Sequence, residues 1–345
     1  MKDTNQIKIA VIIVGFNSRK YLKECFESTL KALKKKGIII FIDNCSTDDS
    51  LEWTAKNYPK IILINSKKNL GFAEANNVAV RKAINLHCQY LLLLNPDTVI
   101  HPESISKLIK SADNETILQP LILLHKNGQP TYKINTYGNI IHYLGFSYVG
   151  GYKLDYRNVQ FDIDLSVASG AAMWIPVRII KKIGLFDKGF FMYHEDLDFS
   201  WRSRLAGFKI RLISDSLVWH KYSYGRNLNK YYYAERNRII FMLKNYQIRT
   251  LVLISPMFLL NELLINFHAI ISGYFKYKLQ SYLSVIRYLP VIWNFRINKK
   301  ANTKFDRDLI RYFSCQLDFS EMNIAGISFY NRILCWYWVL VRNIV

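Results

Sequence analysis

In the first hundred residues, short apolar runs of strand length alternate with segments that have helical periodicity. The apolar runs span residues 7–14, 38–42, 61–64 and 90–94. An uninterrupted apolar run of this length is typical of a parallel strand that is buried on both faces, and the segments between the runs place their apolar residues on one helical face. This alternation constrains the fold more than any other feature of the chain. It predicts an α/β fold with a parallel, doubly wound sheet.

Polar residues follow each of the four apolar runs. Asn17, Asp43, Asn69 and Asp97 lie just beyond the expected carboxyl ends of the strands. Ligands bind at this edge of such sheets, because the loops and the helix N-termini converge there. Each residue alone fits a turn or a helix cap. Four of them on one rim indicate a ligand site.

The common nucleotide-binding motifs are missing from the sequence. No G-x-G-x-x-G follows the first strand and no G-x-x-x-x-G-K-[ST] occurs, which argues against a dinucleotide dehydrogenase and a P-loop NTPase. The net charge of +21 favours an anionic partner such as nucleic acid, anionic lipid or a phosphorylated substrate. Since the sequence has no zinc-finger spacing, RNA-binding aromatic motif or obvious recognition helix, we expect no nucleic-acid partner.

An acidic cluster stands in the stretch FDKGFFMYHEDLDFSWRSR, residues 186–204. Glu195, Asp196 and Asp198 fall within four positions, beside several aromatic side chains. Carboxylates next to apolar bulk bind a cation, hold an arginine or act as a base. The spacing of the apolar residues after them predicts a helix over residues 197–205, which puts Glu195 and Asp196 at a helix N-terminus. There, acidic residues also complement the helix dipole, so a cap and a catalytic group both remain open.

The segment between the fourth strand and the acidic cluster is less regular. Residues 131–165 are rich in Tyr, Gly and Asn, which suits a hairpin or a flap. In the following ASGAAMWI, residues 168–175, Gly170 would let a ligand or another backbone approach closely, although tight packing explains it equally well.

The cysteines and the start of the chain indicate its compartment. Five cysteines, an odd number without a C-x-x-C pair, fit a reducing environment and give no metal signature. The chain begins MKDTNQ and runs directly into a strand. We therefore expect a cytoplasmic start without a signal peptide.

The last third of the chain is basic, aromatic and apolar. Residues 226–244 include Arg226 and Arg236 and read as a helix that either grips a phosphate or faces a membrane. Residues 251–275 are strongly apolar, but their longest uncharged window before Glu262 has 11 residues, too short to span a bilayer. We expect an interfacial or re-entrant hydrophobic hairpin on an anionic membrane surface, followed by basic residues that include Lys299 and Lys300. The alternative is a packed helical dimerisation region, and so a homo-oligomer.

Seven motifs, taken in their order and spacing, identify a family. They are VIIVGFN, FIDNCSTDDS, NLGFAEANN, LLLLNPDT, SGAAMWI, GLFDKGFFMYHEDLDFSWR and VWH, within residues 7–238. Together they resemble the inverting family 2 glycosyltransferases of the GT-A fold, and within these the rhamnosyltransferase-like subgroup. The resemblance implies a GT-A catalytic domain over residues 1–225 and a helical, membrane-associating region over residues 226–345.

The resemblance implies a role for each matching residue. Asp43 would face the nucleobase, Asp97 and His220 would bind Mg²⁺ or Mn²⁺ at the donor diphosphate, and Asp196 would be the general base, with Glu195 its neighbour. The remaining donor-binding residues would be Gly15, Asn17, Asn44, Asn69, Gly71 and Asn76, and the acceptor or phosphate would meet Gly170, Trp174, Arg226 and Arg236. The usual D-x-D of the fold reads Asn-Pro-Asp here, at residues 95–97, so the site offers one carboxylate instead of two.

These roles imply transfer of a sugar, with rhamnose the first donor to try, from a nucleoside diphosphate to a lipid-linked or cell-envelope glycan. The expected location is the cytoplasmic face of the cell membrane. Asp198 is expected to be structural and to pair with Arg202 four residues on. Two other functions remain open: a sugar-phosphate nucleotidyltransferase, which would need a basic triphosphate loop after the first strand, and a non-catalytic membrane scaffold.

Overall fold

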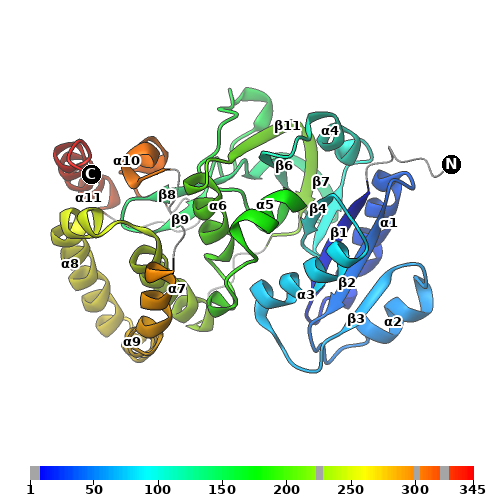
Figure 1. Cartoon of the computed structure of the whole chain (residues 1–345), viewed down its shortest axis with the longest axis horizontal. Coiled ribbons are helices and arrows are strands. Elements are labelled where there is room, and N and C mark those ends of the chain that lie inside the picture. The colour runs from blue at the N-terminus through cyan, green and yellow to red at the C-terminus, as the bar shows by residue number, and fades with distance from the viewer. Residues whose placement is uncertain (1–7, 223–227, 299–303, 319–325) are drawn as a thin grey trace. The chain divides into compact units, whose positions relative to one another are not determined.

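The computed structural model describes residues 8–222, 228–298, 304–318 and 326–345 (Figure 1). The chain divides into two compact units. The first comprises Met1–Asn139, Val149–Phe191 and Phe208–Ser223, and the second Ile140–Tyr148, Met192–Gly207 and Tyr224–Val345. The second unit contains the chain from residue 224 onward, and the domain boundary at 225 stays a prediction. The second unit also contains Ile140–Tyr148 and Met192–Gly207, which come earlier in the chain. The two units are therefore not two consecutive pieces of the sequence.

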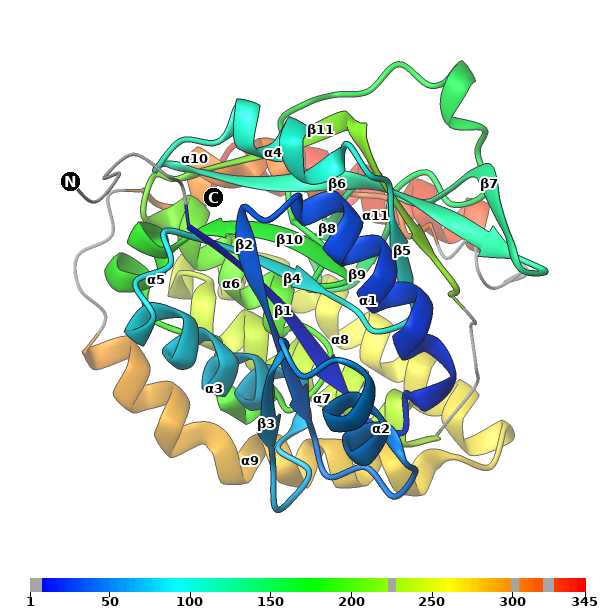
Figure 2. The same ribbon diagram turned by 90° about the vertical axis from the view of Figure 1, so that its right-hand side faces the viewer.

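The first half of the first unit has the predicted strand and helix alternation. Its elements are β1 Ile9–Gly15, α1 Arg19–Leu33, β2 Gly37–Asp43, α2 Ser50–Asn57, β3 Ile62–Asn65, α3 Gly71–Asn85 and β4 Tyr90–Leu94. The strands run parallel in the order β3-β2-β1-β4, and all of β1 and β4 is buried. Figure 2 shows α1 and α3 on opposite sides of these strands, the arrangement of a doubly wound sheet.

The prediction of an all-parallel sheet is wrong for the other half of the unit. The elements there are β5 Thr98–Ile100, α4 Ser104–Ser111, β6 Thr116–Lys126, β7 Gln129–Thr136, η1 Tyr156–Asn158, β10 Ala172–Pro176, α5 Val177–Ile183, η2 Lys188–Phe190 and β11 Lys209–His220. The sheet continues β4-β10-β6-β11-β5, and β10 is antiparallel to both of its neighbours. The sheet is therefore mixed. Strand β10 is an apolar strand that enters the middle of the sheet from a long excursion of the chain, and β5 and β7 are also antiparallel to their neighbours β11 and β6.

The second unit is mostly helical. It contains β8 Asn139–His142 and β9 Ser147–Val149 at its edge, α6 Glu195–Leu205, α7 Leu228–Asn245, α8 Ile248–Ile271, α9 Phe275–Ile297, α10 Asp306–Leu309, η3 Ile310–Tyr312, β12 Phe313–Ser314 and α11 Ile327–Val341. A small sheet has the order β12-β8-β9. The apolar stretch predicted as an interfacial or re-entrant hairpin forms the single helix α8, which continues through Pro256. Among the described residues, α8 alone is long and apolar enough to cross a membrane.

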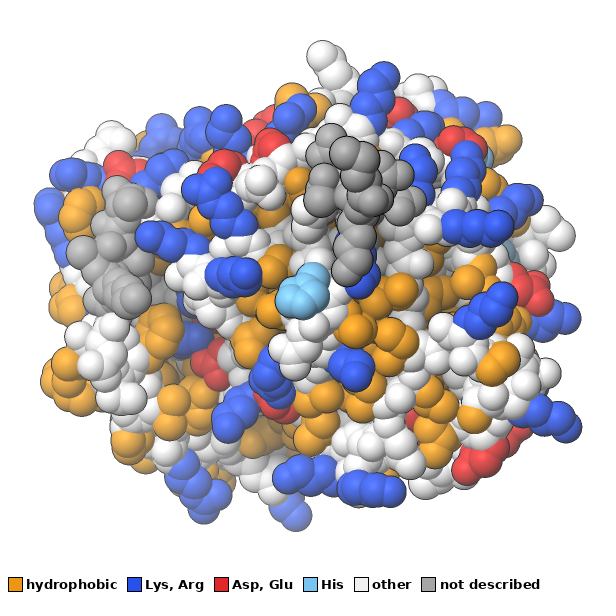
Figure 3. Space-filling view, turned by 45° about the vertical axis from the view of Figure 1, so that its right-hand side comes forward, with side chains coloured by type: hydrophobic (Ala, Val, Ile, Leu, Met, Phe, Trp, Pro, Cys, Tyr) orange, Lys and Arg blue, Asp and Glu red, His pale blue; other side chains and the backbone are white. Residues whose placement is uncertain are grey.

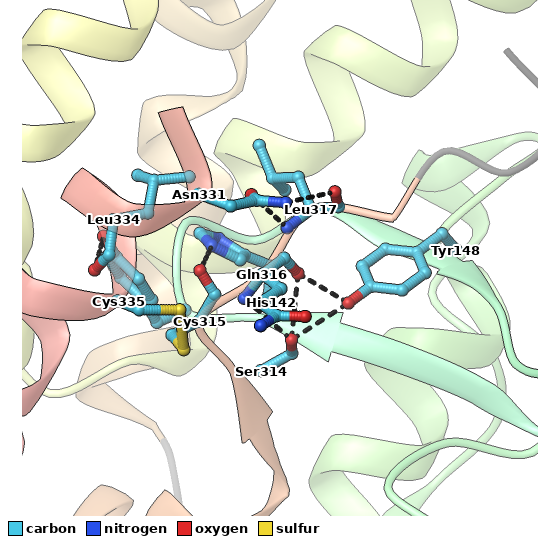
Figure 4. Close-up of a disulfide and its surroundings, with 10 residues drawn as sticks. His142, Tyr148, Ser314, Cys315, Gln316, Leu317, Asn331, Leu334 and Cys335 are labelled. Atoms are coloured by element: carbon cyan, nitrogen blue, oxygen red, sulfur yellow. Dashed lines mark hydrogen bonds between the residues drawn. A yellow bond between two sulfur atoms is a disulfide. The ribbon is translucent and has the colours of Figure 1, made fainter. Parts of the chain in front are cut away.

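A disulfide joins two cysteines that the sequence analysis had expected to be reduced. Cys315 follows β12 and Cys335 lies in α11, 20 positions later (Figure 4). The Nε2 of His142 lies 3.2 Å from the carbonyl oxygen of Cys315, and the Tyr148 hydroxyl donates to the carbonyl of Gln316 at 2.6 Å. The pairing was not visible in the sequence because only the packing of α11 beside the small sheet brings the two sulfurs together.

The basic composition is visible at the surface. Figure 3 shows one face on which many Lys and Arg side chains lie among patches of hydrophobic side chains, with fewer Asp and Glu. This agrees with the net charge of +21.

Candidate functional site

Asp43 ends β2 in the first unit and is almost completely buried, at 2% exposure. One carboxylate oxygen, Oδ2, accepts a hydrogen bond from the backbone N–H of Ser46 at 3.0 Å. The other, Oδ1, is buried and has no hydrogen-bond partner within the described residues. Leaving a buried acceptor unsatisfied costs about 1–3 kcal/mol. This oxygen is therefore suited to accept a hydrogen bond from a ligand at the rim of the sheet.

The loops after β1 and β2 are bonded to one another. The Asn17 side chain accepts a hydrogen bond from the backbone N–H of Thr47 at 2.8 Å, and the Asn17 N–H donates to the Ser46 hydroxyl at 2.9 Å. At Gly15, a side chain would put its Cβ 2.5 Å from the Ser18 hydroxyl oxygen. A side chain at Gly15 would thus collide with Ser18 and with the ring of Phe41, which pack closely against the end of β1.

Asn44 connects the loop after β2 to the loop before α3. Its side-chain amide donates to Asn69 Oδ1 at 3.0 Å, and its Oδ1 accepts from the Leu70 N–H at 2.8 Å. Gly71 has φ +73°, and a Cβ at this position would lie 2.5 Å from the carbonyl oxygen of Phe191. The predicted donor-binding residues therefore form one hydrogen-bonded rim, and the side chains of Asn44 and Asn69 hold its loops in place.

Asp97 and His220 are brought together in the first unit although they are 123 positions apart in the sequence. Strand β5, which follows Asp97, pairs antiparallel with the end of β11 at His220. His220 Nε2 lies 3.1 Å from Asp97 Oδ1, and Nδ1 lies 2.9 Å from Asn135 Oδ1. Burial would raise the pKa of Asp97, but the hydrogen bond and the charge of His220 outweigh it and lower that pKa.

The spacing of this pair fits a divalent cation. An octahedral Mg²⁺ has ligands at about 2.0–2.1 Å, which places neighbouring ligands about 3 Å apart. His220 Nε2 and Asp97 Oδ1 are separated by 3.1 Å. The described residues contain no group of three or more His, Cys, Asp or Glu side chains that could hold a metal ion. A cation bound by these two residues would thus take its other ligands from phosphate oxygens and water.

Glu195 and Asp196 begin α6 in the second unit, as the sequence predicted. Glu195 is 6% exposed, and its Oε2 has no hydrogen-bond partner within the described residues. Burial, and then the charge of Asp196, raise the pKa of Glu195 well above its usual range. Asp196 is less buried, and its Oδ1 accepts from the backbone N–H of Leu197 at 2.8 Å. Of the two carboxyl groups, Asp196 is therefore the better candidate for the ionised form at neutral pH.

Asp198 has the structural role predicted for it. Its Oδ2 accepts a hydrogen bond from Arg202 Nε at 2.7 Å, the expected pair four residues on. Its Oδ1 accepts from Lys244 Nζ at 2.8 Å and from the side-chain amide of Asn245 at 2.9 Å. Burial would raise the pKa of Asp198, but the charges of Lys244 and Arg202 outweigh it and lower that pKa. The carboxylate thus joins α6 to the end of α7.

The chain reaches α6 through a turn with unusual backbone angles. Phe191, Tyr193 and His194 have φ values of +61°, +67° and +67°. For residues other than glycine, such angles cost about 1–3 kcal/mol each, and they persist only where surrounding contacts impose them. The strained turn ends directly before Glu195, so it determines where the acidic pair starts.

Helix α7 supplies the contacts that hold this turn. Asn237 is fully buried, and its side-chain amide donates to the carbonyl oxygens of Met192 and Tyr193, both at 2.8 Å. His194 Nε2 lies 3.3 Å from the carbonyl oxygen of Gly145. Burial lowers the pKa of His194 to about 4, so the ring is neutral at pH 7 and donates through Nε2–H. The Asn237 bonds thus satisfy two carbonyls of the strained turn, and the His194 bond holds the side chain at its end.

Asn237 could not be assigned this role from the sequence, where it stands between two charged residues. Arg236 is buried, and its Nε donates to the Ser284 hydroxyl at 2.8 Å. Arg238 is buried in ion pairs with acidic side chains that include Glu262. The one available signal was an uncharged polar residue in the middle of a basic run. Phosphate binding by Arg236 remains a prediction.

The other predicted site residues have different surroundings. Asn76 is buried in α3 and donates to the carbonyl of Phe72 at 2.8 Å. Gly170 is buried in the turn before β10. Trp174 is fully buried in β10 and stacks on Tyr90 at 5.2 Å, which is the position of a core residue and does not support contact with an acceptor. Arg226, like Lys299 and Lys300, lies outside the described residues.

The sequence of the chain is similar to known proteins. Residues 10–184 match the family model described as "Glycosyl transferase family 2". The chain is similar to the low-salt glycan biosynthesis hexosyltransferase Agl10 of Haloferax volcanii, with 27% identity over 207 residues, which are 59% of this chain and 63% of Agl10. It is also similar to the rhamnosyltransferase WbbL of Escherichia coli K12, with 24% identity over 242 residues, which are 67% of this chain and 88% of WbbL.

A solved structure has a similar fold. The crystal structure of GalNAc-T7 with UDP, GalNAc and Mn²⁺ matches with a TM-score of 0.57 and 17% identity, over 72% of this chain and 49% of GalNAc-T7. At this identity, the match concerns the fold alone. It agrees with the GT-A-type architecture expected from the sequence motifs.

Proposed function

Because the chain belongs to glycosyl transferase family 2, we propose that it transfers a sugar from a nucleoside-diphosphate donor to an acceptor hydroxyl, with inversion at the anomeric carbon. The observation that carries the proposal is the unpartnered, buried Oδ1 of Asp43 at the rim of the sheet. A nucleobase N–H bonded to this oxygen would satisfy it. The hydrogen-bonded loops around it provide the surface on which a nucleoside rests.

In this proposal Asp97 and His220 hold a divalent cation, Mg²⁺ or Mn²⁺, together with the donor diphosphate. The bound cation would neutralise charge that develops on the leaving diphosphate. The 3.1 Å separation of the two side chains supports this role. With one carboxylate and one imidazole, we expect the affinity for the cation to be low until the donor adds its phosphate oxygens.

Asp196 is the proposed general base. It would take the proton of the acceptor hydroxyl as the oxygen attacks the anomeric carbon on the face opposite the leaving diphosphate, which inverts the configuration in one displacement. A positioned base contributes about 10²- to 10⁴-fold to the rate. The raised pKa of Glu195 supports the assignment to Asp196, because a higher pKa shifts the Glu195 carboxyl group toward its protonated form, which cannot accept the proton.

Rhamnose is the first donor sugar that we would test, since one of the similar proteins is a rhamnosyltransferase, and another hexose is the next. The proposed acceptor is a lipid-linked or cell-envelope glycan, and the proposed location is the cytoplasmic face of the cell membrane. The net charge of +21 supports partners that carry phosphate, as the donor, a lipid-linked acceptor and an anionic membrane do.

A donor panel tests the proposal. Nucleoside-diphosphate sugars are screened by thermal shift with Mg²⁺ or Mn²⁺ present, because a ligand that binds only the native state raises its stability. The donor found is then used in a transfer assay that compares the wild type with Asp196→Asn and Glu195→Gln. We expect Asp196→Asn to abolish transfer and to leave donor binding largely intact. Turnover of this variant within tenfold of the wild type would remove Asp196 as the base.

The two rival functions predict different results in the same experiments. Pyrophosphate released from a mixture of nucleoside triphosphate and sugar phosphate would indicate a nucleotidyltransferase. A purified protein that neither binds nor turns over any donor of the panel would indicate a scaffold.

A further inference from the structure

Helix α8 has its polar residues inside and its apolar residues outside. Its buried residues include Thr250, Asn261 and Glu262. Its exposed large apolar side chains are Ile248, Val252, Leu259, Leu260, Leu263, Leu264, Phe267, Ile270 and Ile271, and Arg249 and His268 are exposed beside them. The apolar side chains recur at helical spacing and so form one stripe. A helix on the surface of a water-soluble protein has the opposite distribution.

Helix α9 repeats this reversal. Lys278 is 0% exposed and Ser281 is also fully buried. The exposed large apolar side chains of α9 are Phe275, Leu279, Leu283, Ile286, Leu289, Val291, Trp293 and Ile297. Two consecutive helices thus each expose a set of large apolar side chains, and we call these two sets together the α8–α9 outer face. Exposed apolar side chains gathered in this way mark a protein or membrane contact.

The charges on this surface distinguish between the two kinds of partner. Arg249, Lys276 and Arg287 are exposed. The only acidic residue between Ile248 and Asn298 is Glu262, which is buried. The α8–α9 outer face is therefore apolar and cationic, without an exposed acid. A second copy of the same face would bring like charges together, whereas an anionic lipid surface complements both the apolar and the cationic side chains.

The buried side of α8 determines how the helix can meet a bilayer. Glu262, near the middle of α8, is bonded to Arg238 of α7 and to Lys278 of α9, and Lys278 also pairs with Glu235 of α7. If α8 crossed a bilayer, this ion cluster and the helices that carry it would lie near the centre of the hydrocarbon, where charged side chains are costly. With α8 parallel to the membrane plane, the cluster stays on the protein side and the apolar stripe faces the lipid.

We propose that the α8–α9 outer face binds an anionic lipid bilayer by lying on its surface, with neither helix spanning it. The membrane-binding proposal rests on the proposed function in one respect: an enzyme bound to the membrane surface would meet a lipid-linked acceptor there. The binding itself needs no catalysis, so the two proposals can fail separately.

The test is flotation of the purified full chain with vesicles of phosphatidylcholine alone or mixed with phosphatidylglycerol. The test variant is Leu263→Glu with Phe267→Glu, which changes side chains that are 68% and 66% exposed. The matched control is Leu154→Glu with Ile163→Glu, at two exposed apolar positions of the first unit. We expect the wild type and the control to float with anionic vesicles, and the test variant to partition at least tenfold less.

Four outcomes would overturn the proposal. They are no flotation of the wild type, equal flotation of the test variant, resistance of the bound protein to extraction at alkaline pH, and light scattering that shows a wild-type dimer which the test variant dissociates. Resistance to extraction would mean that α8 spans the bilayer, and the dimer would mean that a second copy occupies the face. Donor-induced thermal shift is measured on the same variants. An unchanged donor shift with lost flotation would support the proposed membrane surface and leave the proposed catalytic function unaffected.

Discussion

Replacing Asn237 by alanine removes the two hydrogen bonds that hold the turn before α6. Both bonds are 2.8 Å long and end on the backbone carbonyls of Met192 and Tyr193. A fully buried carbonyl left unsatisfied costs about 1–3 kcal/mol, and because these two bonds are only part-buried, the penalty for both is at most about 2–6 kcal/mol. At present Tyr193 and His194 each have φ +67°, and each of these strained angles costs about 1–3 kcal/mol. The turn can therefore avoid part of the penalty for the lost hydrogen bonds by relaxing both residues to ordinary φ angles.

Relaxation of the turn would move the start of α6 and the carboxylate of Asp196 with it. Because a displacement of about 1 Å at a reacting group can cost roughly 10²-fold in rate, we expect Asn237→Ala to lower kcat about 100-fold. The loss of global stability should be the smaller part of the penalty, about 1–3 kcal/mol. Donor binding should be unchanged, because the predicted donor residues belong to the first unit.

The assay is steady-state transfer, with kcat and the donor KM determined separately, together with urea unfolding of the same samples. Asn331→Ala is the matched control. Asn331 also makes two backbone hydrogen bonds, with the N–H and the carbonyl of Leu317 at 2.8 and 3.0 Å, in the same unit but remote from α6 in the chain. Its loss should lower stability without the fall in kcat. A kcat for Asn237→Ala within threefold of the wild type would refute the reasoning, and so would equal losses of kcat in both variants.

Three further predictions concern the metal, a buried ion pair and pH. Asp97→Ala should abolish the difference between donor-binding heats measured with and without Mg²⁺ or Mn²⁺, and an unchanged difference would exclude it as a ligand. Lys244→Met leaves Asp198 without one of its buried cationic partners, so the free energy of unfolding in urea should fall by up to about 3–5 kcal/mol. The loss should be smaller than this limit because Arg202 still pairs with Asp198. Burial lowers the pKa of His142 to about 3 and of His194 to about 4. As the pH falls, these two histidines are therefore protonated in the unfolded chain before they are protonated in the folded chain, which favours unfolding. Each histidine should raise the unfolding constant by up to tenfold per pH unit as the pH falls from about 6.5 toward 4. Urea midpoints that stay constant between pH 7 and 5 would contradict this last expectation.

The family relationship and the membrane proposal bear on each other through the second unit. The family model covers residues 10–184 and ends before α6, so the proposed base and all of α7, α8 and α9 lie beyond the matched residues. Helix α7 contributes Asn237 and Lys244 to the contacts that hold the start of α6, and Arg238 to the cluster that fixes α8. One helix therefore links the acidic pair to the proposed membrane surface.

The sequence by itself determined the features that depend on short stretches of chain. Strands β1 to β4 could be predicted because each is a local apolar run, whereas their order in the sheet came from the structure. The same locality placed Asp43 and Asp97 at the ends of strands and Glu195 and Asp196 at the start of a helix. The pair of Asp97 and His220 came from the resemblance to a family, since 123 residues separate the two side chains.

Only the tertiary structure decided the features that depend on contacts between distant segments. Strand β10 is an apolar run like β4, and nothing within it specifies that it pairs antiparallel in the middle of the sheet. The role of Asn237 depends on carbonyls 44 and 45 positions away, which no local pattern encodes. In α8, the sequence shows that apolar side chains predominate, but only the packing shows that Glu262 faces the protein while Leu263 faces outward. The physical reason is the same in each case: hydrogen bonds, ion pairs and burial act over a few ångströms in space, and the fold alone determines which residues come that close.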